Sequence, residues 1–161
     1  VDRVIFIPDE YLAKHVASQT NKVEIIAWKG HCEVHERFTA EEIQDYRKGF
    51  EGLGVIAHPE CPPDVLGEAD FVGSTAGMID YVGDHRPSKV LMVTECSMSD
   101  NVAAEYPELE FVRPCNLCPH MKQITLPKIM ASLETLSPAI EVDPDVADRA
   151  RQSVVRMLEL S

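Results

Sequence analysis

Short apolar runs rich in Val, Ile and Phe alternate along the chain with segments whose apolar residues recur at helical spacing. Runs of this kind, a few residues long and bounded by polar, Gly or Pro positions, are typical of buried β-strands. A regular alternation of strands and helices predicts an α/β fold in which parallel sheets are covered by helices on both faces. The expected strands are residues 3–7, 23–28, 54–58, 71–72, 89–94, 109–112 and 139–142.

Helix start signals follow the expected strands. Asp9 can cap a helix that runs to about Ser18, and Thr39-Ala40-Glu41-Glu42 has the spacing of a capping box. Asp143 is followed by a proline at the first helical position, which predicts a last helix. The expected helices are residues 9–18, 39–50, 62–69, 74–82 and 99–106, one from about 119 to 136, and one from 143.

Residues with reactive or metal-binding side chains fall at or just past the ends of these strands. In open parallel sheets, ligands bind beyond the carboxyl ends of the strands. We therefore expect these side chains to share one site at that edge of the sheet. The residues concerned are Cys32, His58, Ser74, Glu95 and Cys115.

Two cysteine-bearing pairs suggest a metal. Cys32 and His35, together with Cys115 and Cys118, have the donor types of a closed tetrahedral zinc site. Alternatively, the cysteines are small buried apolar residues and the histidine a satisfied neighbour. A reactive dithiol at Cys115 and Cys118 is a third interpretation, although no thioredoxin-like unit surrounds it.

Two turns carry further candidates. His58-Pro59-Glu60 places an imidazole and a carboxylate two residues apart on a stiff turn, where they can divide substrate binding from proton transfer; the alternative is a solvated surface turn. Gly73-Ser74-Thr75, between a strand and a helix, can offer N–H groups and hydroxyls to an anion. Its alternative is plain helix capping.

The charge and composition of the chain limit the kinds of molecule that it can bind. The 161 residues carry a formal net charge of −12 at pH 7, whereas nucleic acid or an anionic membrane would require a basic face. No apolar run approaches the roughly 20 residues that cross a bilayer, and the first twenty positions are too charged for a signal peptide. We expect a cytoplasmic protein whose five cysteines are thiols or metal ligands and not disulfides.

Six stretches occur together in one order and carry a family resemblance. They are Phe6-Ile7-Pro8-Asp9, Trp28-x-Gly-x-Cys32-x-Val-His35, Ala57-His58-Pro59-Glu60-Cys61, Gly73-Ser74-Thr75, Thr94-Glu95 and Cys118-x-x-Met121. Each is weak alone, but the ordered set is specific and spans nearly the whole chain. It resembles quinolinate synthase, the iron–sulfur enzyme of de novo NAD biosynthesis.

The resemblance implies repeated three-layer αβα domains with short parallel sheets, arranged around a central cavity. Residues 1–31 would finish a middle domain, 32–114 would form a third domain, and 115–161 would supply a ligand loop and helices that pack on an absent first domain. The chain would then be the C-terminal half of the enzyme. By motif, Cys32 and Cys118 match two ligands of a 4Fe–4S cluster, and Cys115 competes with Cys118.

The implied reaction condenses iminoaspartate with dihydroxyacetone phosphate to quinolinate, phosphate and water, with L-aspartate oxidase as a possible supplier of iminoaspartate. Glu60 would be the acid/base and His35 would assist proton transfer. His58, Ser74 and Thr75 would bind substrate. Two interpretations remain beside this one, namely a zinc-binding structural domain without catalysis and a metal-free interaction module.

Overall fold

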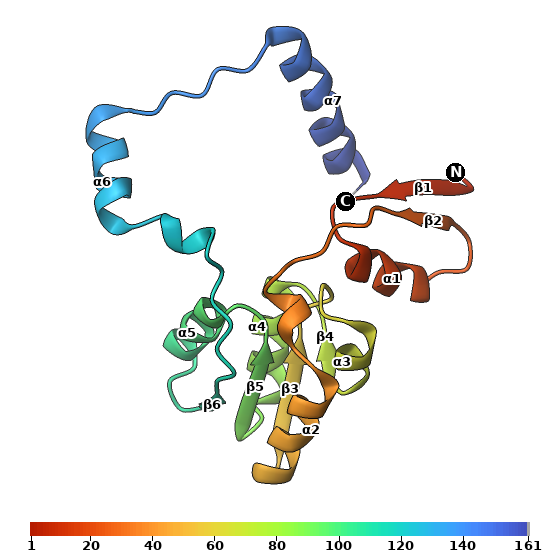
Figure 1. Cartoon of the computed structure of the whole chain (residues 1–161), viewed down its shortest axis with the longest axis vertical. Helices are drawn as coiled ribbons and strands as arrows, with labels where there is room; N and C mark the ends of the chain where they lie inside the picture. Colours follow the sequence, from red (N-terminus) through yellow and green to blue (C-terminus); the bar gives the residue numbers. More distant parts are fainter. Residues whose placement is uncertain (161) are drawn as a thin grey trace. The chain divides into compact units, whose positions relative to one another are not determined.

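The structure is a computed structural model that describes residues 1–160. It divides into two compact units, one of residues 1–119 and one from His120 onward. Figure 1 shows the elements of both units, which are described separately below.

A small parallel sheet opens the first unit. β1 (Arg3–Phe6) pairs with β2 (Glu24–Ala27), and α1 (Glu10–Ser18) connects them. Asp9 caps α1, because its side chain accepts a hydrogen bond from the backbone N–H of Leu12. Apolar side chains on and beside this sheet are exposed, namely Ile5, Ile7, Ile26 and Trp28.

The second sheet is entirely parallel, with strand order β4-β3-β5-β6 (Figure 1). The strands are β3 (Leu53–Ala57), β4 (Phe71–Val72), β5 (Lys89–Val93) and β6 (Glu110–Val112). The central pair aligns Leu53 with Lys89 and Ala57 with Val93. Both central strands are almost fully buried, as expected where helices cover both faces of a sheet.

Alternate residues of the central strands enter two different apolar clusters. Val55 and Leu91 join a cluster with residues of α2 (Ala40–Gly49) and α3 (Pro63–Gly67). Ile56 and Met92 join a cluster with residues of α4 (Thr75–His85) and α5 (Cys96–Glu105). The sheet therefore lies between two helical layers, which confirms the predicted α/β fold with short parallel sheets.

The predicted helix caps are largely confirmed. Thr39 and Glu42 form the capping box of α2, and Ser74 caps α4. Helix α5 begins at Cys96 and not near Ser99 as predicted. The earlier start follows from the Glu95 carboxylate, which accepts a hydrogen bond of 2.7 Å from the Ser97 N–H and so caps the helix.

The unit from His120 contains a 3₁₀ turn, η2 (Met121–Gln123), and two helices, α6 (Leu126–Thr135) and α7 (Pro144–Leu160). The helix predicted to begin near residue 119 begins later, at Leu126, because Thr125 caps α6 and Pro127 lies in its first turn. The strand predicted over 139–142 is wrong: this segment of the described chain is irregular. Exposed apolar residues of α6 and α7 include Leu126, Met130, Leu133, Val154, Met157 and Leu158.

No helix among residues 1–160 combines the length and the apolar character that crossing a membrane would require.

Candidate functional site

The segment between β2 and α2 brings two predicted residues to the carboxyl ends of the central strands. It forms the 3₁₀ turn η1 (His35–Arg37), which follows Cys32. The N–H of Glu36 donates to the carbonyl of Cys32 at 3.0 Å, so Cys32 and His35 belong to one closed turn. His35 is buried and Cys32 is partly exposed.

His35 is held at both ring nitrogens. Its Nδ1 lies 3.1 Å from Oε2 of Glu60, and its Nε2 lies 3.0 Å from Oγ1 of Thr94. Its ring also stacks on that of His58, with ring centroids 4.5 Å apart and planes 10° apart. Donor atoms of Cys32, His35 and Glu60 all lie within 4.8 Å of one another. The structure thus gathers residues from three separate loops.

The charge of Glu60 decides which groups donate in this network. The hydrogen bond from His35 lowers the pKa of Glu60, so its carboxylate is ionised near neutral pH and can only accept. The Nδ1–H of His35 must therefore donate to Glu60. In a neutral ring Nε2 then carries a lone pair, which accepts the hydroxyl hydrogen of Thr94.

His58 belongs to the same turn as Glu60. The backbone N–H of Glu60 donates to Nδ1 of His58 at 3.3 Å, which leaves Nε2 of His58 as the N–H donor in the neutral ring. Burial lowers the pKa of His58, and the neighbouring His35 acts in the same direction. His58 is therefore a neutral hydrogen-bonding group near pH 7.

Cys61 is a packing residue. Its thiol is fully buried, it belongs to the apolar cluster under α2 and α3, and its Sγ–H donates to the carbonyl of Val93. Burial raises the pKa of this thiol to about 12, which keeps it protonated.

Ser74 and Thr75 lie at the start of α4 and are both exposed. The Ser74 hydroxyl accepts a hydrogen bond of 3.2 Å from the N–H of Gly77. Helix capping, the alternative interpretation of this turn, is therefore present, and the hydroxyl hydrogen of Ser74 is still available to donate. Their predicted role in binding substrate stays a prediction.

The loop after β6 connects Cys118 to the end of β5. The Cys118 N–H donates to Oε1 of Glu95 at 3.4 Å, and Glu95 and Asn116 form a parallel bridge. Glu95 follows Thr94, the residue that contacts His35. Both segments that carry the predicted ligands, Cys32 and Cys118, thus contact residues at the end of β5.

One prediction about the cysteines is wrong. Cys96 and Cys115 form a disulfide, whereas all five cysteines were expected as thiols or metal ligands. The two residues are 19 positions apart, and the start of α5 brings them together because the N–H of Cys96 donates to the carbonyl of Asn116. With its sulfur in a disulfide, Cys115 offers no thiolate, so the four-residue zinc site is not assembled.

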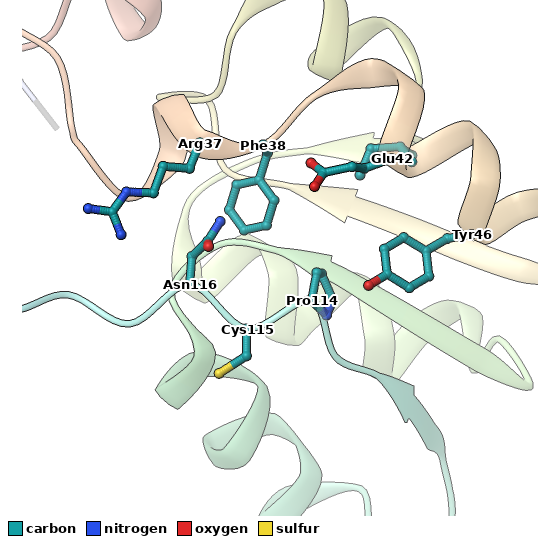
Figure 2. A pocket seen from close by; sticks show the side chains of 8 residues that line it. Arg37, Phe38, Glu42, Tyr46, Pro114, Cys115 and Asn116 are labelled. Carbon is teal, nitrogen blue, oxygen red and sulfur yellow. The ribbon is translucent and has the colours of Figure 1, made fainter.

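A cavity of about 150 Å³ lies beside this loop, between α2 and residues 114–116 (Figure 2). Its lining includes Arg37, Glu42 and Tyr46. The side chain of Cys115 turns from the cavity toward α5. The cavity is lined by none of the predicted catalytic or substrate-binding residues, and we assign it no role.

Two residues of the network had no assigned role in the sequence. Thr94 and Asp9 were each one member of a motif, and Asp9 was also expected to cap a helix. In the structure, Thr94 contacts His35, and Asp9 accepts a hydrogen bond from the Cys32 N–H at 2.9 Å. The sequence placed Thr94 at a strand end and Asp9 at a helix start. No local pattern indicates that their partners would be His35 and Cys32.

The fold and the site define a class: an α/β protein with a thiol, imidazole and carboxylate network at the carboxyl ends of parallel strands, the arrangement of an enzyme active site. Residues 1–159 match the protein family described as "Quinolinate synthetase A protein". The chain belongs to this family, as its motifs had suggested.

Named relatives agree with this assignment. The chain is 65% identical over 156 residues to "Quinolinate synthase 1" of Mesorhizobium japonicum, covering 97% of this chain and 48% of the relative. It is 59% identical to "Quinolinate synthase" of Agrobacterium fabrum (99% and 46%). It is 54% identical to the enzyme of that name from Xylella fastidiosa (99% and 47%). The chain therefore spans about half the length of these relatives.

Proposed function

We propose that this chain supplies the acid/base part of a quinolinate synthase site, which condenses iminoaspartate with dihydroxyacetone phosphate to give quinolinate, phosphate and water. The observation that carries the proposal is the network of Glu60, His35 and His58 at the carboxyl ends of the central strands. The family and the names of the relatives support the substrates.

Glu60 is the proposed acid/base. Its lowered pKa leaves it ionised, so it can take a proton from a substrate carbon and later return one to a departing hydroxyl. His35 donates its Nδ1–H to the same carboxylate, which orients Oε2 and stabilises the charge. His35 therefore assists proton transfer through Glu60, and Thr94 holds the opposite side of its ring.

His58, Ser74 and Thr75 are the proposed substrate-binding residues. Because His58 is neutral, it contributes an Nε2–H hydrogen bond to a carboxylate or phosphate oxygen and no full positive charge. The hydroxyls of Ser74 and Thr75 lie at the N-terminus of an 11-residue helix, where the helix dipole favours an anion.

The proposed cofactor is a 4Fe–4S cluster bound by Cys32 and Cys118. Thiolates are the usual ligands of such clusters, and with Cys96 and Cys115 paired and Cys61 buried and protonated, these two residues fit that requirement. When bound, the cluster would supply an open iron that acts as a Lewis acid toward a substrate oxygen. The remaining ligand would come from a part of the enzyme outside this chain.

The exposed apolar residues fit the proposed division into domains. In that division residues 1–31 complete a middle domain, 32–114 form the third domain, and 115–161 carry the ligand loop and the last helices. The small β1–β2 sheet, with Trp28 63% exposed, and the helices α6 and α7 would be covered by the rest of the enzyme. A cytoplasmic location and supply of iminoaspartate by L-aspartate oxidase belong to the same proposal.

The test uses the full-length enzyme, reconstituted anaerobically with iron and sulfide. We expect brown protein with visible cluster absorption and quinolinate as product from iminoaspartate and dihydroxyacetone phosphate. Cys32→Ser should abolish the cluster, whereas Cys96→Ser, which removes a cysteine of the disulfide, should retain it. A cluster-loaded enzyme that forms no quinolinate would refute the proposed reaction, and a colourless zinc protein would favour the structural alternative.

A further inference from the structure

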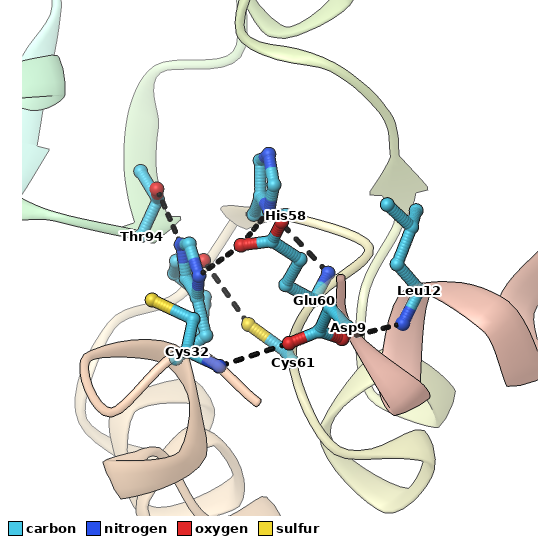
Figure 3. A network of polar contacts seen from close by, with 9 residues as sticks. Asp9, Leu12, Cys32, His58, Glu60, Cys61 and Thr94 are labelled. Atoms are coloured by element: carbon cyan, nitrogen blue, oxygen red, sulfur yellow. Dashed lines mark hydrogen bonds and ion pairs between the residues drawn. The ribbon is translucent and has the colours of Figure 1, made fainter. Parts of the chain in front are cut away.

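Asp9 uses both oxygens of one buried carboxylate to connect two parts of the first unit (Figure 3). Oδ1 accepts the N–H of Leu12 at 2.8 Å, which caps α1. Oδ2 accepts the N–H of Cys32, 23 positions away, at 2.9 Å. The residue is only 3% exposed, so water does not replace either contact.

The backbone around Asp9 is fitted to the segment that carries Cys32. The N–H of Glu10 donates to the carbonyl of Gly30 at 2.7 Å. A Cβ at Gly30 would lie 2.6 Å from the carbonyl oxygen of Pro8, closer than real Cβ atoms approach, so this position requires glycine. The start of α1 therefore fixes residues 30–32 by two hydrogen bonds, of which only the one to Asp9 involves Cys32 itself.

Fixing the backbone of Cys32 also orients its neighbours in the site. The hydrogen bond from the Glu36 N–H to the Cys32 carbonyl closes a turn that contains His35, the partner of Glu60. A displacement at Cys32 would therefore move a proposed cluster ligand and a proposed proton-transfer residue together.

We propose that Asp9 is the positioning residue of the Cys32 ligand loop, a role that rests on the proposed ligation by Cys32. The chemistry explains the residue type. Helix capping alone accepts Asn, Ser or Asp almost equally. At Asp9 the N–H groups of Leu12 and Cys32 approach different oxygens, and a carboxylate presents two acceptor oxygens whereas an amide or a hydroxyl presents one.

Asp9→Asn separates the two functions of the side chain. Asparagine retains one acceptor oxygen, which can cap α1, but its NH₂ group then faces the Cys32 N–H as a second donor. We expect amide hydrogen exchange in the chain to accelerate at least about tenfold at Cys32, with Leu12 nearly unchanged. Unchanged protection at Cys32 would overturn the proposal.

Asp143→Asn is the matched control. Asp143 also accepts two backbone N–H groups, from Asp145 and Val146, but with a single oxygen, Oδ1, and at an exposed position just before α7. This substitution should leave exchange at Cys32 unaltered. Asp9→Ser is a second variant that retains a capping hydroxyl, and it should also release the Cys32 amide.

The reconstituted full-length enzyme tests the consequence for the metal. Partners that orient a metal ligand typically contribute about 10–100-fold to metal affinity, so Asp9→Asn should lose cluster absorption to a chelator about that much faster than the parent. Equal loss rates would overturn the positioning role. If no cluster binds even to the parent enzyme, the proposed function fails, whereas the exchange measurement still decides whether Asp9 holds Cys32.

Discussion

Replacing Thr94 by valine tests the hydrogen-bond network around His35. Valine has nearly the shape of threonine, so the substitution removes the hydroxyl and leaves the volume almost unchanged. The Nε2 lone pair of His35 then loses its 3.0 Å partner inside a buried site. An unpaired buried polar group destabilises the folded state by about 1–3 kcal/mol, and we expect a loss of this size.

Urea unfolding followed by circular dichroism measures this change, with Thr94→Ser as the control that retains the hydroxyl. Thr94→Ser should recover most of the loss. A double-mutant cycle with His35→Phe then isolates the contact, because Thr94→Val should have little further effect once the imidazole is absent. An unchanged unfolding free energy in Thr94→Val, or an undiminished effect beside His35→Phe, would refute the assigned hydrogen bond.

Four further predictions concern the site. In the full-length enzyme Glu60→Gln should retain the cluster and lower turnover by about 10²–10⁴-fold; near-normal turnover would limit Glu60 to positioning. His58→Ala should also raise the KM, because a substrate hydrogen bond is lost, and an unchanged KM would argue against that contact. Burial lowers the pKa of His58 in the folded chain below its ordinary 6.5. As pH falls below about 6.5, the unfolded chain therefore binds this proton before the folded chain does, and the free energy of unfolding should fall. His58→Gln should flatten this part of a stability–pH curve. Finally, Cys118→Ser should abolish cluster absorption while Cys115→Ser retains it; the reverse result would reassign the ligand.

Glu60, like His58, should make the free energy of unfolding smaller at low pH. The pKa of Glu60 is lowered from its ordinary 4.5 by the hydrogen bond from His35. A lowered carboxyl pKa adds stability that is complete above the ordinary value and is lost as pH falls through the folded-state value. Stability measured in Glu60→Gln should therefore depend less on pH below about 4.5 than in the parent chain.

Local sequence determined most of the secondary structure. The capping box of Thr39 and Glu42, the cap at Asp9 and the apolar runs at β3 and β5 act over a few residues, so each could be identified without a tertiary contact. The placement of candidate residues at strand ends followed from the same signals. Where prediction was wrong, as over residues 139–142, an apolar run had been interpreted as a strand although a strand requires a neighbouring strand with which to pair.

The tertiary structure alone decided which of these residues meet. His35 contacts Thr94 across 59 positions and Glu60 across 25, Asp9 contacts Cys32 across 23, and Cys96 bonds to Cys115 across 19. No periodicity encodes such partners, because they depend on the order β4-β3-β5-β6 and on the paths of the loops above it. The sequence thus identified the chemical groups of the site, whereas parallel strand packing determined the hydrogen bonds that make Glu60 an ionised and oriented carboxylate.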